Sequence, residues 1–109
     1  MRTLLEREPD IDAVMVCSDQ MAIGALGVAH QIGRRIPQEL AIVGFDNIPE
    51  SAFFWPPLTT VYQQLIDVGC IAVQNLHQWI EAKRKGEATP LENVRLTPEL
   101  IVRESSAQH

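Results

Sequence analysis

Two aspartates, Asp19 and Asp46, follow apolar segments and carry the side chains best suited to hold a small polar molecule. The segments, residues 12–17 and 39–45, are rich in β-branched residues and show no alternation of polar and apolar positions. This pattern predicts strands that are buried on both faces, as in a parallel sheet. The carboxyl ends of parallel strands lie at one edge of the sheet, where open α/β folds bind ligands. We therefore expect both carboxylates at one rim.

Polar neighbours extend this predicted rim. Ser18 and Gln20 flank Asp19, and Asn47 follows Asp46. Hydroxyl, amide and carboxylate oxygens accept hydrogen bonds from the hydroxyl or amine groups of a small ligand. The structural alternative is that Asp19 only caps a helix and that Asp46 only forms a turn. The residues alone favour this alternative for Asp19 and the ligand role for Asp46, which directly follows an apolar run.

Catalytic and metal-binding arrangements find little support in the sequence. His30, His77 and His109 have no His, Cys or acidic partner at a spacing suited to zinc. Ser18 has no evident base, so it does not resemble a nucleophile. A hydrolase that uses the two aspartates as a pair of acids is the enzymatic alternative. We expect no enzymatic activity, no metal and no cofactor.

The segment between the two strands predicts a helix from about Gln20 to Gln31, ended by Gly33. Strand, helix and strand with short connections form a βαβ unit, whose crossover is right-handed. The apolar stripe of this helix is expected at Met21, Ala25, Val28 and Ile32.

Two glycines, Gly24 and Gly27, lie inside the same helix, where each costs about 1 kcal/mol relative to Ala. Such a cost indicates that another backbone comes close, either the sheet beneath or a second subunit. Phe53, Phe54 and Trp55 pose a related choice: the rings can stack on a ligand, anchor an interface or fill the core. Three consecutive large rings cannot all point the same way, so we expect at least one to meet a ligand or partner.

The remaining segments complete the predicted α/β architecture. We expect a helix end at residues 3–8, a third strand at 58–64, a long helix at 65–85, a polar linker at 87–93 and an extended ending that forms an edge strand. The long helix has an apolar stripe of Leu65, Val68, Ala72, Leu76 and Trp79.

Composition narrows the class of protein further. The 109 residues have a net charge of −5 and 46% hydrophobic content, which predicts one small folded domain. No basic patch stands out, so this segment should not bind DNA through phosphate contacts. No apolar run of about 18 residues predicts a membrane span. Cys17 and Cys70 are expected as buried small hydrophobes, which suggests a reducing compartment.

Several phrases, taken together, resemble the LacI/GalR family of bacterial transcription regulators. They are CSDQMAIGAL, RRIPQELAIVGFDNIP, PPLTTV, the following GCIAV helix and the terminal PELIVRESS. The resemblance covers essentially the whole chain, as the carboxy-terminal part of the effector-binding domain. It implies a periplasmic-binding-protein-like fold of two α/β subdomains with effector between them, a homodimer, and a separate helix-turn-helix that binds operator DNA.

The resemblance also implies roles for single residues. Asp46 matches the family's acid that contacts effector hydroxyls, and Gln63 matches a Gln beside the cleft. Ser18 and Asp19 stand where sugar-responsive members usually have an Asn-Asp pair, so a hydroxyl replaces the amide. The implied dimer surface includes the helix with Met21, Gly24 and Ala25, together with Phe54.

The family pattern divides the chain into residues 1–63 of the second subdomain, a helix at 64–86 that packs on the first subdomain, and a terminal segment at 87–109. We expect a fragment whose exposed helix stripe, with Leu76 and Trp79, must be covered by pairing, by an exchange of helices or in another way. We also expect it to bind a sugar or nucleobase without useful affinity. A cytoplasmic regulator is the favoured interpretation, and a periplasmic sugar-binding protein is the alternative.

Overall fold

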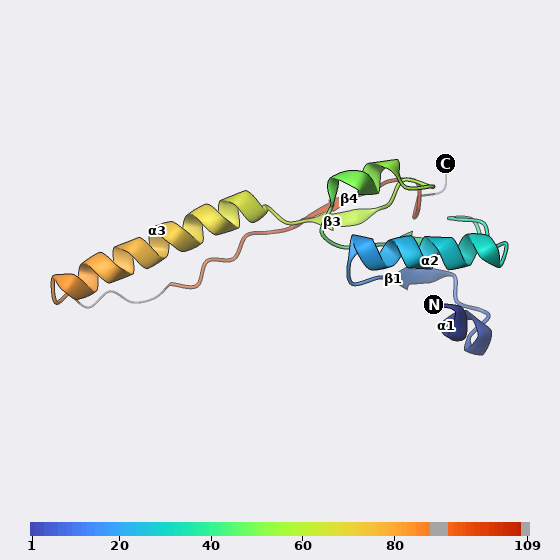
Figure 1. Cartoon of the computed structure of the whole chain (residues 1–109), viewed down its shortest axis with the longest axis horizontal. Coiled ribbons are helices and arrows are strands. Elements are labelled where there is room, and N and C mark those ends of the chain that lie inside the picture. Colours follow the sequence, from blue (N-terminus) through green and yellow to red (C-terminus); the bar gives the residue numbers. More distant parts are fainter. Residues whose placement is uncertain (88–91, 108–109) are drawn as a thin grey trace. The chain divides into compact units, whose positions relative to one another are not determined.

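The computed structural model describes residues 1–87 and 92–107 and divides the chain into two compact units (Figure 1). The first unit is Met1–Tyr62 together with Glu99–His109, and the second is Gln63–Pro98. This division differs from the expected one, because the end of the chain returns to the first unit instead of forming a separate segment. Part of the predicted linker at 87–93 and His109 lie outside the described residues.

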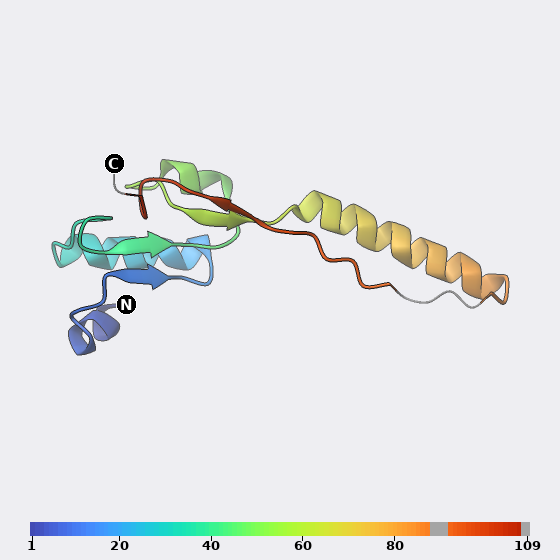
Figure 2. The same cartoon turned by 180° about the vertical axis from the view of Figure 1, so that it is seen from behind.

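The first unit contains the predicted βαβ arrangement (Figure 2). Strand β1 (Ala13–Met15) pairs in parallel with β2 (Ala41–Val43), and helix α2 (Asp19–Gln31) connects them. Val43 forms a parallel bridge to Thr59, which continues the same strand direction toward β3 (Thr60–Tyr62). The expectation of parallel strands with a crossover helix is confirmed.

The end of the chain pairs with the third strand. Strand β4 (Glu99–Ile101) runs antiparallel to β3, as the edge strand expected from the extended ending. Beyond β4, the backbone N–H of Ile42 donates to the carbonyl of Ser105, and the amide of Ser105 donates to the carbonyl of Pro57. The Ser105 hydroxyl donates to the Ile42 carbonyl and accepts from the Thr59 amide. Fully buried Ser105 therefore joins β2 to the segment before β3.

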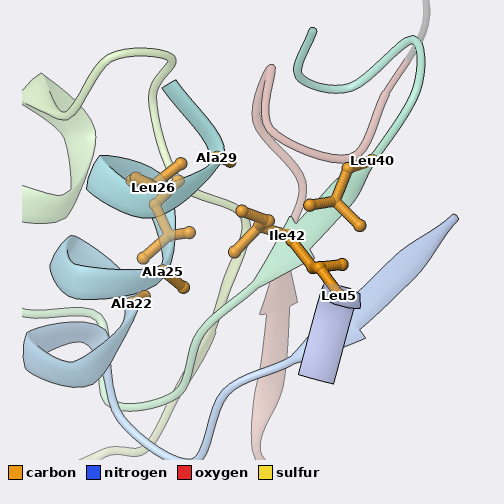
Figure 3. Close-up of a cluster of buried hydrophobic side chains, with 8 residues drawn as sticks. Leu5, Ala22, Ala25, Leu26, Ala29, Leu40 and Ile42 are labelled. Atoms are coloured by element: carbon orange, nitrogen blue, oxygen red, sulfur yellow. The ribbon is translucent and has the colours of Figure 1, made fainter. Parts of the chain in front are cut away.

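Small side chains let helix α2 lie close to the sheet (Figure 3). The core consists of Leu5, Ala22, Ala25, Leu26, Ala29, Leu40, Ile42 and Leu58. Of the predicted stripe, Ala25 is buried and Val28 is half-buried. The prediction is wrong at Met21, which is 62% exposed, and at Ile32, which is 39% exposed. Alanines contribute little to a hydrophobic pattern. The larger apolar residues beside them therefore dominated the predicted stripe.

Two short helices flank this core. Helix α1 (Arg2–Arg7) places Leu5 in the core, in agreement with the predicted helix end. The 3-10 helix η1 (Pro49–Phe53) lies between β2 and β3. Its fully buried Ser51 donates a side-chain hydrogen bond to the Ile48 carbonyl, which holds the first turn.

The second unit consists of helix α3 (Leu65–Arg84) and the segment that returns from it. Val68, Ile71 and Ala72 line a groove of about 150 Å³ with Val94 and Leu96 of the returning segment. No residue of α3 is buried. Of the predicted stripe, Leu76 is exposed, whereas Trp79 is half-buried with the Lys83 ammonium 4.6 Å from its ring centroid.

The exposed cysteines correct one expectation. Cys17 and Cys70 are both exposed thiols, not buried hydrophobes. Cys17 follows β1, which within the described residues is paired only with β2, and Cys70 lies on α3.

Among the described residues, no helix combines the length and the apolar character that a membrane crossing requires.

Candidate functional site

The chain leaves β2 through a left-handed turn at Asp46 and Asn47, whose φ angles are 118° and 55°. Asn adopts this region readily, but the φ of Asp46 lies where side chains are strained. Three consecutive amides pin the turn: Asp46 donates to the Val61 carbonyl at 3.0 Å, Asn47 to Thr60 Oγ1 at 3.2 Å and Ile48 to Asp19 Oδ2 at 2.9 Å. The surrounding hydrogen bonds therefore impose the unusual backbone.

The Asp19 carboxylate is the buried support of this turn. It is fully buried, and its Oδ1 accepts from Thr60 Oγ1 at 2.6 Å while Oδ2 accepts from the Ile48 amide. Its own amide donates to the Phe45 carbonyl at 2.9 Å. Asp19 thus joins the start of α2 to the segment that follows β2 and to Thr60, the first residue of β3. Both carboxylate oxygens are occupied by protein donors.

Gly44 lies directly against this carboxylate. A Cβ at position 44 would meet Asp19 Oδ1 well inside contact distance and Leu58 Cδ2 at 2.8 Å. Here glycine is needed for the close approach of the strand to a buried side chain.

Ser18, not Asp19, caps helix α2. The Ser18 hydroxyl accepts from the Met21 amide at 3.2 Å, and its backbone is extended, as expected for an N-cap. Ser18 is half-buried, and the bond uses one lone pair of its oxygen. Its hydroxyl hydrogen and second lone pair are not used by that bond.

The structure brings Ser18 and Asp46 to the same edge of the sheet. Each is one residue away from the hydrogen bond that joins the Asp19 amide to the Phe45 carbonyl. Asp46 is exposed, and no hydrogen bond of its carboxylate occurs among the described residues. Gln63 belongs to the second unit, where it is half-buried and lines a groove of about 170 Å³ with Leu65 and Leu96.

An arginine that the sequence analysis missed organises the loop after Asp46. Arg103 donates through Nη2 to Asn47 Oδ1 at 3.0 Å and through Nη1 to Ser51 Oγ and the Leu58 carbonyl, both at 2.9 Å. Its amide donates to Thr59 Oγ1 at 2.8 Å. The only sequence signal was its place in the family-like PELIVRESS phrase.

The residues predicted for a dimer surface lie in different environments. Met21 and Gly24 are exposed and line an apolar groove of about 520 Å³ beside β1. Ala25 is buried in the core, and half-buried Phe54 packs against it. The two outward rings are Phe53, 87% exposed, and Trp55, 81% exposed.

The loop that carries these rings is attached to α2. His30 Nε2 donates to the Trp55 carbonyl at 2.7 Å. A groove of about 240 Å³ is lined by Ile23, Leu26, Gly27, His30, Phe54 and Trp55. A Cβ at Gly24 or Gly27 would have no atom within 4 Å. The sheet beneath therefore does not explain these glycines, and the second-subunit explanation stays a prediction.

Within the parts of the chain that the structure describes, no group of three or more His, Cys, Asp or Glu side chains could hold a metal ion. The side chains at the sheet edge are instead oxygen acceptors and a hydroxyl. The arrangement can accept hydrogen bonds from a polar molecule.

Comparisons with known proteins agree with this geometry. A family model described as "Periplasmic binding protein-like domain" matches residues 1–106. The chain is 42% identical over 107 residues to a "Ribose operon repressor" of Halalkalibacterium halodurans, covering 96% of the chain and 30% of that protein. It is 38% identical over 105 residues to the "HTH-type transcriptional repressor PurR" of Haemophilus influenzae, covering 96% and 31%.

The fold also matches a solved ligand complex. The structure titled "transcriptional regulator CelR-cellobiose complex" superposes with a TM-score of 0.79 at 36% identity, covering 96% of this chain and 31% of that one. The chain therefore spans about a third of the length of the relatives it matches.

Proposed function

Because the chain belongs to the LacI/GalR family of transcription regulators, as a part of their periplasmic-binding-protein-like effector domain, we propose that its Asp46 edge forms one wall of an effector site. Ser18 and Asp46 are the residues of this wall that contact the effector. Gln63 belongs to the second unit and is not included in this wall. Asp19 supports the wall from beneath, since both of its oxygens already accept hydrogen bonds from the protein.

The strained, exposed Asp46 is the observation that carries the proposal. A non-glycine residue at φ 118° costs about 1–3 kcal/mol, and such residues cluster at binding and active sites. The turn is held by hydrogen bonds that three backbone amides donate, yet the Asp46 carboxylate itself is left exposed. Stability alone would favour Gly at this position, so the side chain is retained for a role outside the fold.

The acceptors at this edge favour a ligand rich in hydroxyl groups. An ionised carboxylate only accepts hydrogen bonds, and a sugar offers several hydroxyl donors. Two relatives have names that point the same way, one a ribose operon repressor and the other a complex with cellobiose. We propose a sugar or a related polyhydroxylated metabolite as the effector.

The regulatory role follows from linkage. The proposed protein is a cytoplasmic repressor that forms a homodimer, through a surface that includes Met21 and Gly24, and binds operator DNA through a helix-turn-helix. Effector and operator then change each other's affinity by the same factor. Two named relatives are repressors, which supports this role over that of a periplasmic carrier or an enzyme.

Titration of the ¹⁵N-labelled chain with D-ribose and with cellobiose, up to tens of millimolar, tests the proposal. We expect saturable amide shift changes at Asp46 and Asn47 with one of the two sugars, at no better than millimolar affinity, which corresponds to about −4 kcal/mol. Such weak binding agrees with the expectation from the sequence that this chain alone lacks useful affinity for a sugar. In Asp46→Asn the saturable changes are lost.

Asp10→Asn is the matched control, since Asp10 is also exposed and lies in a turn. This variant should respond like the wild type. Absence of saturable shifts with both sugars, or equal shifts in Asp46→Asn, would refute the proposed effector wall.

A further inference from the structure

Arg103 is a half-buried cation whose side-chain N–H groups donate hydrogen bonds to uncharged acceptors. The ion pairs found among the described residues are Arg35–Glu39 and Arg84–Glu81, and neither involves Arg103. A partly buried guanidinium is retained at a cost in desolvation. Its hydrogen bonds to uncharged groups must therefore serve the geometry of those groups.

All three acceptors of this guanidinium belong to the segment between β2 and β3. Asn47 Oδ1 lies on the residue directly after Asp46, Ser51 Oγ lies on η1, and the Leu58 carbonyl lies before β3. Ser51 Oγ in turn donates to the Ile48 carbonyl at 2.7 Å. The guanidinium thus bridges the two ends of the loop that begins at the Asp46–Asn47 turn.

We propose that Arg103 is a positioning residue for the effector wall: it holds Asn47 in the left-handed turn and thereby sets the direction of the Asp46 carboxylate. This inference rests on the proposed function of Asp46. Two independent supports act on the same turn, the buried Asp19 carboxylate through Ile48 and the Arg103 guanidinium through Asn47. The Asp46 carboxylate itself needs no hydrogen bond from the protein to fix its direction, because the next residue, Asn47, is held in place.

The geometry needs an arginine. Its planar guanidinium carries several N–H donors in a rigid fork, whereas a Lys ammonium is a compact charge on a flexible stem. Only the fork reaches a side-chain amide, a hydroxyl and a carbonyl in fixed directions. The backbone of Arg103 is held as well, because its amide donates to Thr59 Oγ1. The end of the chain is thereby connected to the candidate site.

Amide hydrogen exchange of the full chain tests the positioning role with Arg103→Met, Arg103→Lys and the control Arg35→Met. We expect exchange at Asn47 and Ile48 to accelerate about tenfold or more in Arg103→Met, as expected for loss of charge-assisted hydrogen bonds. The β1–β2 amides of Val16 and Ala41 should change less than about twofold.

A merely structural role for Arg103 would behave differently. Loss of global stability accelerates all protected amides together, so equal acceleration at Val16 and Asn47 would overturn the inference. Unchanged exchange at Asn47 and Ile48 would also overturn it. If Arg103→Met does not fold, Arg103→Lys decides, since it keeps the charge and the stem but not the fork.

Titration with D-ribose and cellobiose separates this inference from the proposed function. If the wild type shows the Asp46-dependent response, Arg103→Met should weaken it about tenfold, Arg103→Lys less, and Arg35→Met not at all. Equal binding by wild type and Arg103→Met would overturn the positioning role and leave the effector wall intact. A wild type without any response would overturn the effector wall and the effector part of this inference, whereas the exchange rates would still decide whether Arg103 holds the turn.

Discussion

Gly44→Ala should destabilise the first unit more than any other Gly→Ala substitution in this chain. The added methyl would meet Asp19 Oδ1 well inside contact distance, and Leu58 Cδ2 at 2.8 Å. Both neighbours are fully buried, so neither can turn toward solvent. The Asp19 carboxylate must move, and it then loses the hydrogen bond from Thr60 Oγ1.

The magnitude follows from two terms. Forcing an extra methyl into a packed core costs about 1–3 kcal/mol. Weakening a buried hydrogen bond to a charged group costs about 1.5–3 kcal/mol. Together they predict a loss of about 2.5–6 kcal/mol, a large part of the roughly 5–15 kcal/mol that stabilises a typical domain. The melting temperature should fall by more than about 10 °C.

Chemical and thermal denaturation of Gly44→Ala, monitored by circular dichroism, measures this loss. Gly27→Ala is the matched control, because a Cβ at Gly27 would have no atom within 4 Å. That control should be neutral or stabilise the fold by up to about 1 kcal/mol, as Ala favours helix over Gly. A cost below about 1 kcal/mol for Gly44→Ala, or equal costs for both, would refute the assigned role of the Asp19 carboxylate.

Two further predictions concern other parts of the first unit. Trp55→Ala should change stability by no more than about 0.5 kcal/mol, since the ring is 81% exposed, whereas Phe54→Ala should cost about 2 kcal/mol because its half-buried ring packs on the core; equal melting temperatures for the two variants would contradict this. The Arg35 backbone amide, followed by its guanidinium, lowers the pKa of Glu39 below its ordinary value. The stability that Glu39 contributes is therefore present above the unfolded-state pKa and lost as the pH falls through the lowered pKa. A ¹³C titration should give the Glu39 carboxyl a pKa below its ordinary value. In Arg35→Ala this pKa should rise only part of the way back, because the guanidinium is removed while the backbone amide of residue 35 still donates to the carboxylate.

Local patterns in the sequence predicted the elements that bring the site together. Apolar β-branched runs marked β1 and β2, and the segment between them was predicted to be a helix. The position of Asp46 at the end of β2 was predicted correctly, because strand ends are marked by a short-range change from apolar to polar residues. The family phrases carried the resemblance to the LacI/GalR family, and the comparisons confirm that family.

The face that α2 buries was decided by packing. The sequence pattern favoured the larger side chains Met21, Val28 and Ile32, yet alanines form most of the buried stripe. A helix that crosses a sheet at close range needs small residues beneath it, and periodicity of hydrophobicity does not reveal how close the sheet lies. The exposure of Cys17 has a similar origin, since it depends on whether a strand has a neighbour.

Only the tertiary structure decided how the turn at Asp46 is held. Asp19 meets Thr60 across 41 positions of the sequence, and Arg103 meets Asn47 across 56. Neither pair has a local signature, because partners so far apart are brought together by strand order and by the return of the chain through β4. By itself, the sequence determined which residues have the chemistry to bind a polar ligand. The tertiary structure determined that the Asp19 carboxylate accepts hydrogen bonds from the protein while the Asp46 carboxylate is left exposed. The reason is that buried donors in a folded chain take the acceptors near them as hydrogen-bond partners.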